Sequence, residues 1–190
     1  MELARTIPDS RWETIENGIK AIAAPNSDFF VNPETDEVIT SAPFFYREVS
    51  GDFVLRARVK HDFASTYDAC TLLALDHERL WAKACFEMTD YGTHSVVSVT
   101  TNGRSDDANG VAVDGNEVWL QIARKGNVFG IHYSLDGVKF TMARLTWLPM
   151  RAAIKVGFGA QSPTGNGGER YFRDIEFRNV TLKDIRGGNE

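Results

Sequence analysis

The sequence predicts an all-β protein built as a sandwich of two antiparallel sheets. Turn dipeptides recur at intervals of roughly ten residues, and the segments between them are short and rich in β-branched and aromatic residues. Two packed sheets are the simplest arrangement that buries one face of so many strands. The expected turns are NG at 17–18, SGD at 50–52, DYG at 90–92, NG at 102–103 and 109–110, DG at 114–115, KGN at 125–127 and DG at 136–137.

The clearest strand is DFVLRARVKHDF, residues 52–63. Odd-numbered residues from Phe53 to Val59 are apolar and even-numbered ones from Val54 to Lys60 are mostly charged, so one face of this strand is buried. In the last segment, the apolar parity changes between Phe177 and Val180, which predicts a bulge. The further expected strands are THSVVSVTTN (93–102), EVWLQIARK (117–125), VFGIHYS (128–134), VKFTMARL (138–145), KVGFGA (155–160) and YFRDIEFRNVTLKD (171–184).

Length and composition are those of one globular domain, which we place at residues 1–190. The chain is 43% apolar and 25% charged, and these ordinary values exclude a mainly disordered or fibrous protein. No linker, internal repeat or change of composition divides it. A net charge of -5 without a run of Lys or Arg argues against nucleic acid or anionic lipid as a partner.

The sequence also limits where the protein acts. The amino-terminal segment has no apolar stretch after a basic start, and no apolar run is long enough to cross a bilayer, so we expect a cytoplasmic protein without a membrane partner. Two cysteines, Cys70 and Cys85, are too few for a disulfide scaffold and fit a reduced state. A pairing between neighbouring strands stays open.

The segment LWAKACFE, residues 80–87, carries the functional hypothesis. If it is a strand, Trp81, Lys83 and Glu87 share one face, and the small or apolar residues between them face the core. An outward indole beside an ammonium and a carboxylate is typical of a carbohydrate platform. The alternative is a Trp covered by a loop beside a Lys–Glu pair.

Other polar residues join this site only if their strands are neighbours. Asp106 lies in NGRSDD at a strand end, where binding residues are often carried, although the segment also fits an ordinary Asx-rich turn. Arg124 and Arg144 can clamp a ligand or form structural salt bridges. Tyr133 can supply a ring or belong to the core.

Catalytic and metal signatures are weak. Paired carboxylates in an E-x-D-x-x-E strand, a nucleophile elbow, a phosphate-binding loop and paired metal-ligand histidines do not occur. DDANG, residues 106–110, is oxygen-rich but lacks the distal glutamate of a calcium loop. We therefore expect no cofactor, no metal and no catalytic residue, and lean away from an enzyme.

Four segments together resemble the DUF1349 family, which includes the fungal regulation-of-enolase protein. They are YDACTLLALD, LWAKACFE, HSVVSVTTNGRSDD and IHYSLDGVKFTMARL, within about residues 44–160. They are similar to the family's D-x-x-G-L, W-x-K-x-x-x-E, V-V-T-x-x-x-S-D and Y-S-x-D-G-x-x-W/F patterns. The resemblance implies a concanavalin A-like jelly roll and a role in metabolic regulation.

The resemblance also implies site residues. Trp81, Lys83 and Glu87 fall on the W-K-E strand, and Asp68 is retained although Cys70-Thr71 replaces Gly-Leu. Asp107 stands where the family has Trp after its S-D pair, which removes an aromatic wall. The complete set of expected ligand-binding residues is Asp68, Trp81, Lys83, Glu87, Ser105, Asp106, Arg124, Tyr133 and Arg144.

We therefore expect non-catalytic recognition of a carbohydrate or small polyol on a concave sheet face, in a protein that regulates sugar metabolism. One alternative is a glycosidase-like enzyme that uses Glu87 with Asp106 or Asp68. A second alternative is an interaction module for a metabolic enzyme, which a contiguous exposed apolar surface would favour.

Overall fold

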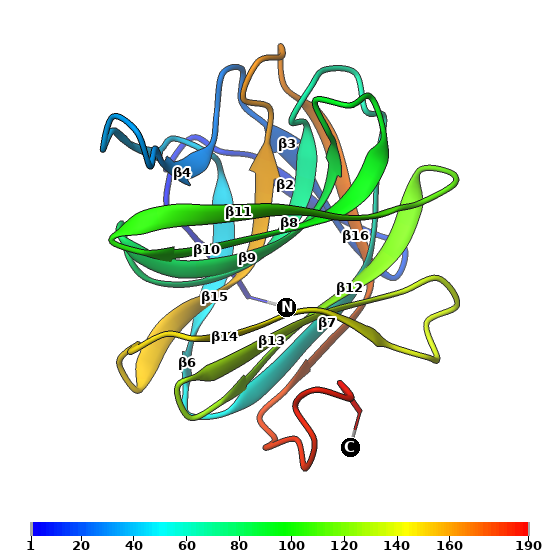
Figure 1. Cartoon of the computed structure of the whole chain (residues 1–190). Coiled ribbons are helices and arrows are strands. Elements are labelled where there is room, and N and C mark those ends of the chain that lie inside the picture. Colours follow the sequence, from blue (N-terminus) through cyan, green and yellow to red (C-terminus); the bar gives the residue numbers. More distant parts are fainter. Residues whose placement is uncertain (1, 190) are drawn as a thin grey trace.

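Two seven-stranded antiparallel sheets pack face to face in the computed structural model of the chain (Figure 1). The structure describes residues 2–189. The predicted all-β sandwich is confirmed. A separate two-stranded hairpin of β4 (Phe29–Val31) and β5 (Val38–Thr40) lies outside the two layers.

Sheet A carries the segment from which the functional hypothesis starts. Its strands, in spatial order, are β1 (Ala4–Arg5), β6 (Phe44–Ser50), β15 (Ala153–Gln161), β8 (Ala69–His77), β9 (Leu80–Met88), β10 (His94–Asn102) and β11 (Arg104–Ala112). Because β8, β9, β10 and β11 follow one another as hairpins, this half of the sheet is a simple meander.

Sheet B forms the opposite layer. Its strands, in spatial order, are β14 (Thr141–Trp147), β13 (Val128–Ser134), β12 (Glu117–Lys125), β7 (Phe53–His61), β16 (Gly168–Arg178), β3 (Gly18–Ala23) and β2 (Trp12–Ile15). The central strand, β7, is the one whose alternation is clearest in the sequence. Phe53, Leu55, Ala57 and Val59 are all fully buried between the sheets, as predicted.

The expected turns connect consecutive strands with one exception. Asn102–Gly103 closes the β10–β11 hairpin, and Gly103 has a φ of 86°, a left-handed conformation that glycine adopts without strain. Asn109–Gly110 does not form a turn. Both residues lie inside β11, where Asn109 pairs with Val97, so this prediction is wrong. The chain reverses instead between β11 and β12, at Asp114–Gly115.

The predicted bulge in the last strand exists but lies earlier in the chain. The pairing of β16 with β7 shifts between Arg173 and Glu176, and Asp174 has a positive φ of 49°. The positions whose side chains face the core therefore change from even-numbered to odd-numbered before Phe177 rather than after it. The added residue reorients the end of β16, as bulges do in antiparallel sheets.

The β4–β5 hairpin lies against sheet A on the side away from sheet B. In Figure 1, β4 lies on the side of β11 opposite to β13 and β14. Phe29 and Phe44 at the base of this segment belong to a second hydrophobic cluster that also contains Leu73, Trp81 and Val99 of sheet A. Sheet A therefore has apolar contacts on both faces, one with sheet B and one with this hairpin.

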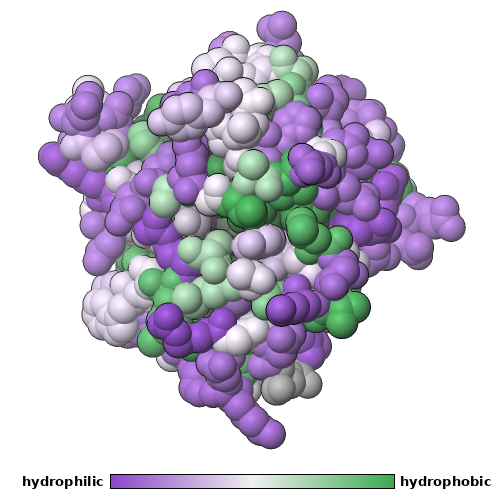
Figure 2. Space-filling view, turned by 45° about the vertical axis from the view of Figure 1, so that its right-hand side comes forward, coloured by the Kyte–Doolittle hydropathy of each residue, from purple (hydrophilic) through white to green (hydrophobic). Residues whose placement is uncertain are grey.

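Figure 2 shows hydrophilic side chains over most of one face, with hydrophobic ones gathered near its middle. Among residues 2–189, no helix has the length and apolar character needed to cross a bilayer.

Candidate functional site

Strand β9 separates its side chains as the sequence predicts. Ala82, Ala84 and Phe86 belong to the core between the two sheets, whereas Trp81 and Cys85 belong to the cluster on the outer face of sheet A. Lys83 and Glu87 have the parity of Trp81 and therefore also lie on the outer face. The predicted alternation is confirmed, and the candidate site is on the outer face of sheet A.

Trp81 is not part of an open surface. Its side chain is 0% exposed, and its indole Nε1–H donates a hydrogen bond to the Glu78 carbonyl oxygen at 3.1 Å. Phe29 and Phe44, which flank the β4–β5 hairpin, lie in the same cluster as the indole. The expectation that Trp81 opens onto a groove is wrong. The alternative that the sequence left open, a Trp covered by a loop, is the one observed.

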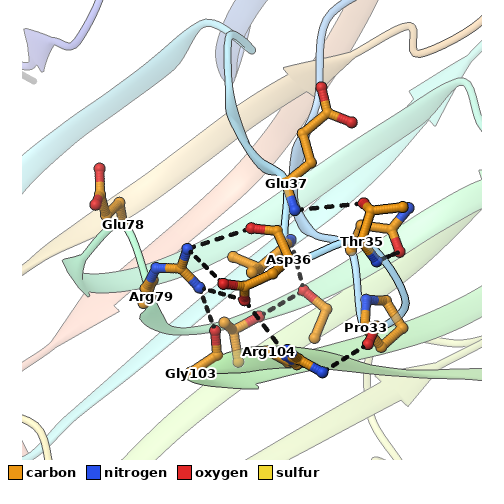
Figure 3. Close-up of polar contacts among 12 residues, drawn as sticks. Pro33, Thr35, Asp36, Glu37, Glu78, Arg79, Gly103 and Arg104 are labelled. Carbon is orange, nitrogen blue, oxygen red and sulfur yellow. Dashed lines mark hydrogen bonds and ion pairs between the residues drawn. The ribbon is translucent and has the colours of Figure 1, made fainter.

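Polar contacts hold the covering hairpin on sheet A (Figure 3). Asp36, near its tip, accepts hydrogen bonds from Arg79 Nη1 at 2.8 Å and from Arg104 Nε at 3.3 Å. The two arginines come from the β8–β9 turn and the start of β11, so one carboxylate joins two turns of the sheet. The pKa of Asp36 is held below its usual value, first by the hydrogen bond from Arg79.

Ser105 is also a hairpin contact rather than a wall of the site. Its hydroxyl oxygen accepts a hydrogen bond from the Val31 backbone N–H at 2.9 Å and lies 2.8 Å from the Thr101 hydroxyl oxygen. Because all of these groups are buried, Ser105 satisfies a backbone donor of β4 that water does not reach.

Lys83 is a buried cation with a complete set of partners. Its ammonium donates to the Phe29 carbonyl oxygen at 2.7 Å, to Gln161 Oε1 at 3.0 Å and to Asp28 Oδ1 at 3.2 Å. Burial opposes its charge, but nearby acidic groups, Asp28 first, outweigh that effect and raise the pKa of Lys83. Gln161 Nε2 in turn donates to Asp28 Oδ1 at 2.6 Å, which fixes this end of the site.

Glu87 is buried without a hydrogen-bonding partner. Glu87 is 7% exposed, and no group within residues 2–189 donates a hydrogen bond to its carboxyl oxygens. Burial raises the pKa of Glu87 to about 8, since the attraction of Lys83 does not offset the loss of water and the repulsion of Asp107, Asp28 and Asp90. Its carboxyl oxygens are not fully enclosed and face the pocket, where a ligand can complete their contacts.

A pocket of about 370 Å³ opens over this face. Both polar residues of the W-K-E strand, Lys83 and Glu87, reach it, so these two expected site residues are brought together. The walls combine carboxyl, amide and ammonium groups with aromatic and aliphatic ones, and comprise Asp28, Phe30, Tyr67, Lys83, Glu87, Val99, Asp107, Gln161, Pro163 and Thr164. A smaller hollow of about 170 Å³ shares three of these residues and is lined by Tyr67, Glu87, Asp90, Asp107 and Asn109.

Tyr67 is a pocket residue that sequence reasoning missed. It is 40% exposed and has a positive φ of 68°, which is unusual for a bulky residue. Its N–H donates to the Met88 carbonyl oxygen at 2.6 Å, and the Met88 N–H donates to the Asp68 carbonyl oxygen at 3.1 Å. Strained residues held by their surroundings cluster at functional sites. No sequence pattern marks this conformation.

Asp68 acts behind the pocket. Its carboxylate lies 3.2 Å from Arg170 Nη2, with both side chains fully buried, and it accepts a hydrogen bond from the Ser65 N–H at 3.1 Å. It does not line the pocket. The expected ligand contact is therefore replaced by a positioning contact that holds the loop carrying Tyr67.

Asp106 and Asp107 point to opposite faces of sheet A. Asp107 pairs with Val99 of β10, lines the pocket and stays partly exposed, and partial loss of water raises its pKa. Asp106 pairs with Thr100, its side chain is 74% exposed, and it contacts Arg144 Nη1 at 3.1 Å. Asp107, and not the expected Asp106, therefore lines the pocket, because the sequence does not fix which parity of β11 faces outward.

Three further expected residues lie elsewhere. Arg144 of β14 donates to Ser98 Oγ at 3.0 Å as well as to Asp106, so it joins the edges of the two sheets. Arg124 of β12 donates through its guanidinium to carbonyl oxygens of the 126 and 150–152 loops. Tyr133 of β13 packs against the core between the sheets. None of the three lines the pocket, since sheet B lies behind sheet A.

The two cysteines are free and buried. Cys70 belongs to the core between the sheets and Cys85 to the cluster on the outer face of sheet A, so their side chains point in opposite directions. Across the part of the chain that the structure describes, no cluster of His, Cys, Asp and Glu is suited to a metal ion.

Comparison with known proteins places the chain in a family. The model of "Protein of unknown function (DUF1349)" matches residues 6–180. The protein belongs to the DUF1349 family. The match extends at both ends beyond residues 44–160, which contain the four resembling segments. A sequence comparison with curated proteins gives no match.

Solved structures share the fold of this DUF1349 protein. A functionally unknown protein from Saccharomyces cerevisiae superposes with a TM-score of 0.79 at 25% identity, over 89% of this chain and 95% of that one. Carbohydrate-binding module CBM66 from Bacillus subtilis superposes with a TM-score of 0.60 at 11% identity, over 92% and 95% of the two chains. The GH43 protein BlXynB from Bacillus licheniformis gives a TM-score of 0.66 at 12% identity, and the match covers 85% of this chain but 32% of that protein.

Proposed function

We propose that this DUF1349 protein recognises a carbohydrate or related small polyol, without catalysis, in the pocket on the outer face of sheet A. The observation that carries this proposal is the carboxyl group of Glu87, which is buried at the pocket wall and accepts no hydrogen bond from residues 2–189. Buried polar groups are normally satisfied. A ligand hydroxyl group would satisfy this one.

The size and walls of the pocket suit such a ligand. A volume of about 370 Å³ lies at the lower end of the range for small-molecule sites, which begins near ~300 Å³. Tyr67 and Phe30 offer aromatic surface, and Glu87, Asp107 and Gln161 offer hydrogen-bonding groups around it. Aromatic surface beside a few polar groups fits the alternating apolar and hydroxylated faces of a sugar.

The fold comparison supports the architecture on which the proposed site is built. CBM66 is described as a carbohydrate-binding module and matches this chain over nearly its whole length. Since the sequence identity is 11%, the comparison supports the architecture, and the ligand class rests on the pocket. The proposed site also differs from the sequence hypothesis, because Tyr67 and Asp107 take the places that Trp81 and Asp106 were expected to fill.

Binding measurements on matched variants test the proposal. We expect glycan-array screening followed by calorimetry to find a sugar ligand, and Glu87→Gln and Asp107→Asn each to weaken its binding by about 5-fold or more, the effect of losing one hydrogen bond. Asp106→Asn changes the neighbouring residue on the opposite face and should leave affinity unchanged. Equal affinity of the wild type, Glu87→Gln and Asp107→Asn for the ligand would refute the proposed site.

A glycosidase-like enzyme is the second candidate, favoured by the raised pKa of Glu87. A carboxyl group with a pKa of about 8 is protonated at neutral pH and suits a general acid. The partner would be Asp107, since Asp106 faces away and Asp68 is paired with Arg170. Hydrolysis of a glycan panel that disappears in Glu87→Gln, with binding retained, would favour the enzyme.

An interaction module for a metabolic enzyme is the third candidate. Leu145 and Trp147 of the edge strand β14 are exposed, Trp147 at 59%, and lie away from the pocket. A role in the regulation of sugar metabolism would follow from the binding of such an enzyme. Absence of any glycan ligand, with a metabolic enzyme bound by the wild type and lost in Trp147→Ser, would replace the carbohydrate proposal with this one.

A further inference from the structure

The charges around the pocket are unbalanced at one end. Lys83 is the one basic residue among those that line the pocket, and its three ammonium N–H groups are directed to Asp28, Gln161 and the Phe29 carbonyl oxygen. It therefore has no donor left for Glu87. The positive charge of Lys83 is therefore used in contacts at the end of the pocket where Asp28 lies.

The other end is acidic. The smaller hollow contiguous with the pocket is lined by Glu87, Asp90 and Asp107, together with Tyr67 and Asn109, and no basic side chain is among its walls. Glu87 is more than nine-tenths buried, lines both spaces and has no hydrogen-bond donor within residues 2–189. The depth at which Glu87 lies, and the lack of a donor from the described residues, distinguish the hollow from a cluster of acids on an open surface.

We propose that this acidic end binds the ammonium group of an amino sugar or similar amino polyol, while the rest of the molecule occupies the larger pocket. The inference deepens the proposed function and rests on it. An ammonium group carries three N–H donors and a positive charge, and so complements the buried carboxyl group of Glu87 and the more exposed one of Asp107 beside it. The exposed ring of Tyr67 adds an aromatic surface of the kind that attracts organic cations.

Other ligands match this end less well. The hydroxyl group of a neutral sugar would donate one hydrogen bond but bring no positive charge to this acidic end. A metal ion is disfavoured, because the described residues contain no group of ligands placed to hold one. An acidic sugar would bring a further negative charge to this acidic end.

Ammonium binding should release a proton. In the free protein, burial raises the pKa of Glu87 to about 8, with Asp28, Asp90 and Asp107 adding to the effect and Lys83 opposing it. A bound ammonium group favours the ionised carboxylate and lowers that pKa. A neutral ligand that hydrogen-bonds to the protonated acid would release no proton, so proton release separates the two modes of binding.

The test compares amino sugars with their neutral counterparts. The probes are glucosamine, galactosamine and mannosamine, each paired with its parent sugar and with its N-acetyl derivative, which keeps the nitrogen but removes the charge. We expect calorimetry at pH 7 to show at least one amino sugar binding 10-fold or more tightly than both neutral partners. Titrations in buffers of different ionisation enthalpy should reveal a released proton.

Variants identify the groups responsible. Glu87→Gln keeps the shape of the side chain and should abolish both the preference for the amino sugar and the proton release, and Asp107→Asn should reduce the preference. Asp106→Asn, on the opposite face, is the matched control and should change neither. A preference for the amino sugar that persists in both Glu87→Gln and Asp107→Asn would overturn the assignment.

The outcomes separate this inference from the proposed function. If neutral sugars bind as tightly as amino sugars, and both lose affinity in Glu87→Gln, the pocket is a carbohydrate site and the ammonium assignment is wrong. If no sugar of either kind binds at millimolar concentration, both proposals fail together.

Discussion

Trp81 and Glu87 lie on the same face of the same strand, yet they belong to different parts of the molecule. Trp81 is enclosed by the β4–β5 hairpin and packs with Phe29 and Phe44, whereas Glu87 lies beyond the hairpin and lines the pocket. The alternation of the strand decides which face a side chain takes. Coverage by a distant segment then decides whether that face becomes core or binding surface.

Lys83 marks the boundary between these two regions. It lies between Trp81 and Glu87 along the strand, contacts Asp28 and the Phe29 carbonyl oxygen of the hairpin base, and also lines the pocket. The hairpin thereby does two things. It buries the indole, and it supplies one wall of the pocket through Asp28 and Phe30.

Removing the indole should have the largest effect on stability. Trp81→Ala creates a cavity beneath the hairpin, and we expect it to lower the free energy of unfolding by about 3–5 kcal/mol, as for other buried large-to-small changes. Urea denaturation followed by circular dichroism measures this. A loss below about 1 kcal/mol would show that the covered end is not core-like. The folded fraction should retain ligand affinity, because Trp81 does not line the pocket.

Removing the carboxyl group of Glu87 should change how stability depends on pH. Its pKa is about 8 in the folded protein against 4.5 for the ordinary group, so the folded state binds more protons between these values and wild-type stability falls as pH rises through this window. Because the glutamine side chain does not titrate, the stability of Glu87→Gln does not fall in this way. We expect it to become more stable than the wild type by pH 8.5 and to differ less at pH 5.

Urea denaturation at several pH values measures the contribution of Glu87. Asp106→Asn is the control, and its curve should follow that of the wild type. If the wild type and Glu87→Gln show the same slope between pH 5 and 8.5, Glu87 is not held in a desolvated environment.

Removing one hairpin contact should have a moderate effect. Ser105→Ala leaves the buried Val31 N–H without its acceptor, and we expect a loss of about 1–2 kcal/mol in unfolding free energy. Thr35→Ala at the exposed tip of the hairpin is the control and should stay near the wild type. Equal stability of the two variants would indicate that Val31 finds another acceptor and that Ser105 does not anchor the hairpin.

Weakening the clamp at the hairpin tip should have the smallest effect on global stability. Asp36→Asn removes the charge that joins Arg79 and Arg104 but keeps a residue that tolerates the positive φ of 64°. We expect the melting temperature to change little, because exposed ion pairs contribute little. Hydrogen exchange of the Phe29–Thr40 amides should become faster.

Mass spectrometry of deuterium uptake measures this local opening, with Glu34→Gln as a neutral comparison in the same loop. Unchanged exchange in Asp36→Asn would mean that apolar contacts alone hold the hairpin. Faster exchange at Trp81 as well would show that the hairpin and the indole open together.

Much of the sheet structure could be predicted from local sequence patterns. The alternation in β7 and β9 identifies strands and their two faces, and the Asn, Asp and Gly pairs identify most hairpin turns. The turn predicted at Asn109–Gly110 does not form, because pairing with β10 holds these residues in an extended strand. Tertiary pairing overrides a local turn preference of this size.

The site could be predicted only in part. Lys83 and Glu87 were found because both lie on one strand, so a period of two residues fixes their common face. Asp107 was missed in favour of Asp106 because nothing in β11, which is largely polar, marks its outward parity. Tyr67 was missed because a positive φ in a loop leaves no sequence pattern.

Local sequence patterns were enough to predict many of the strands, most of the turns between them and the side of β9 on which an indole, an ammonium and a carboxyl group lie, since each of these follows from interactions between residues close in the chain. Only the tertiary structure decided that the indole is core and that the carboxyl group is a pocket wall. That choice depends on where the segment from Asp28 to Thr40 packs. Its contacts with Lys83, Arg79 and Ser105 join residues more than forty positions apart, and no local pattern encodes them.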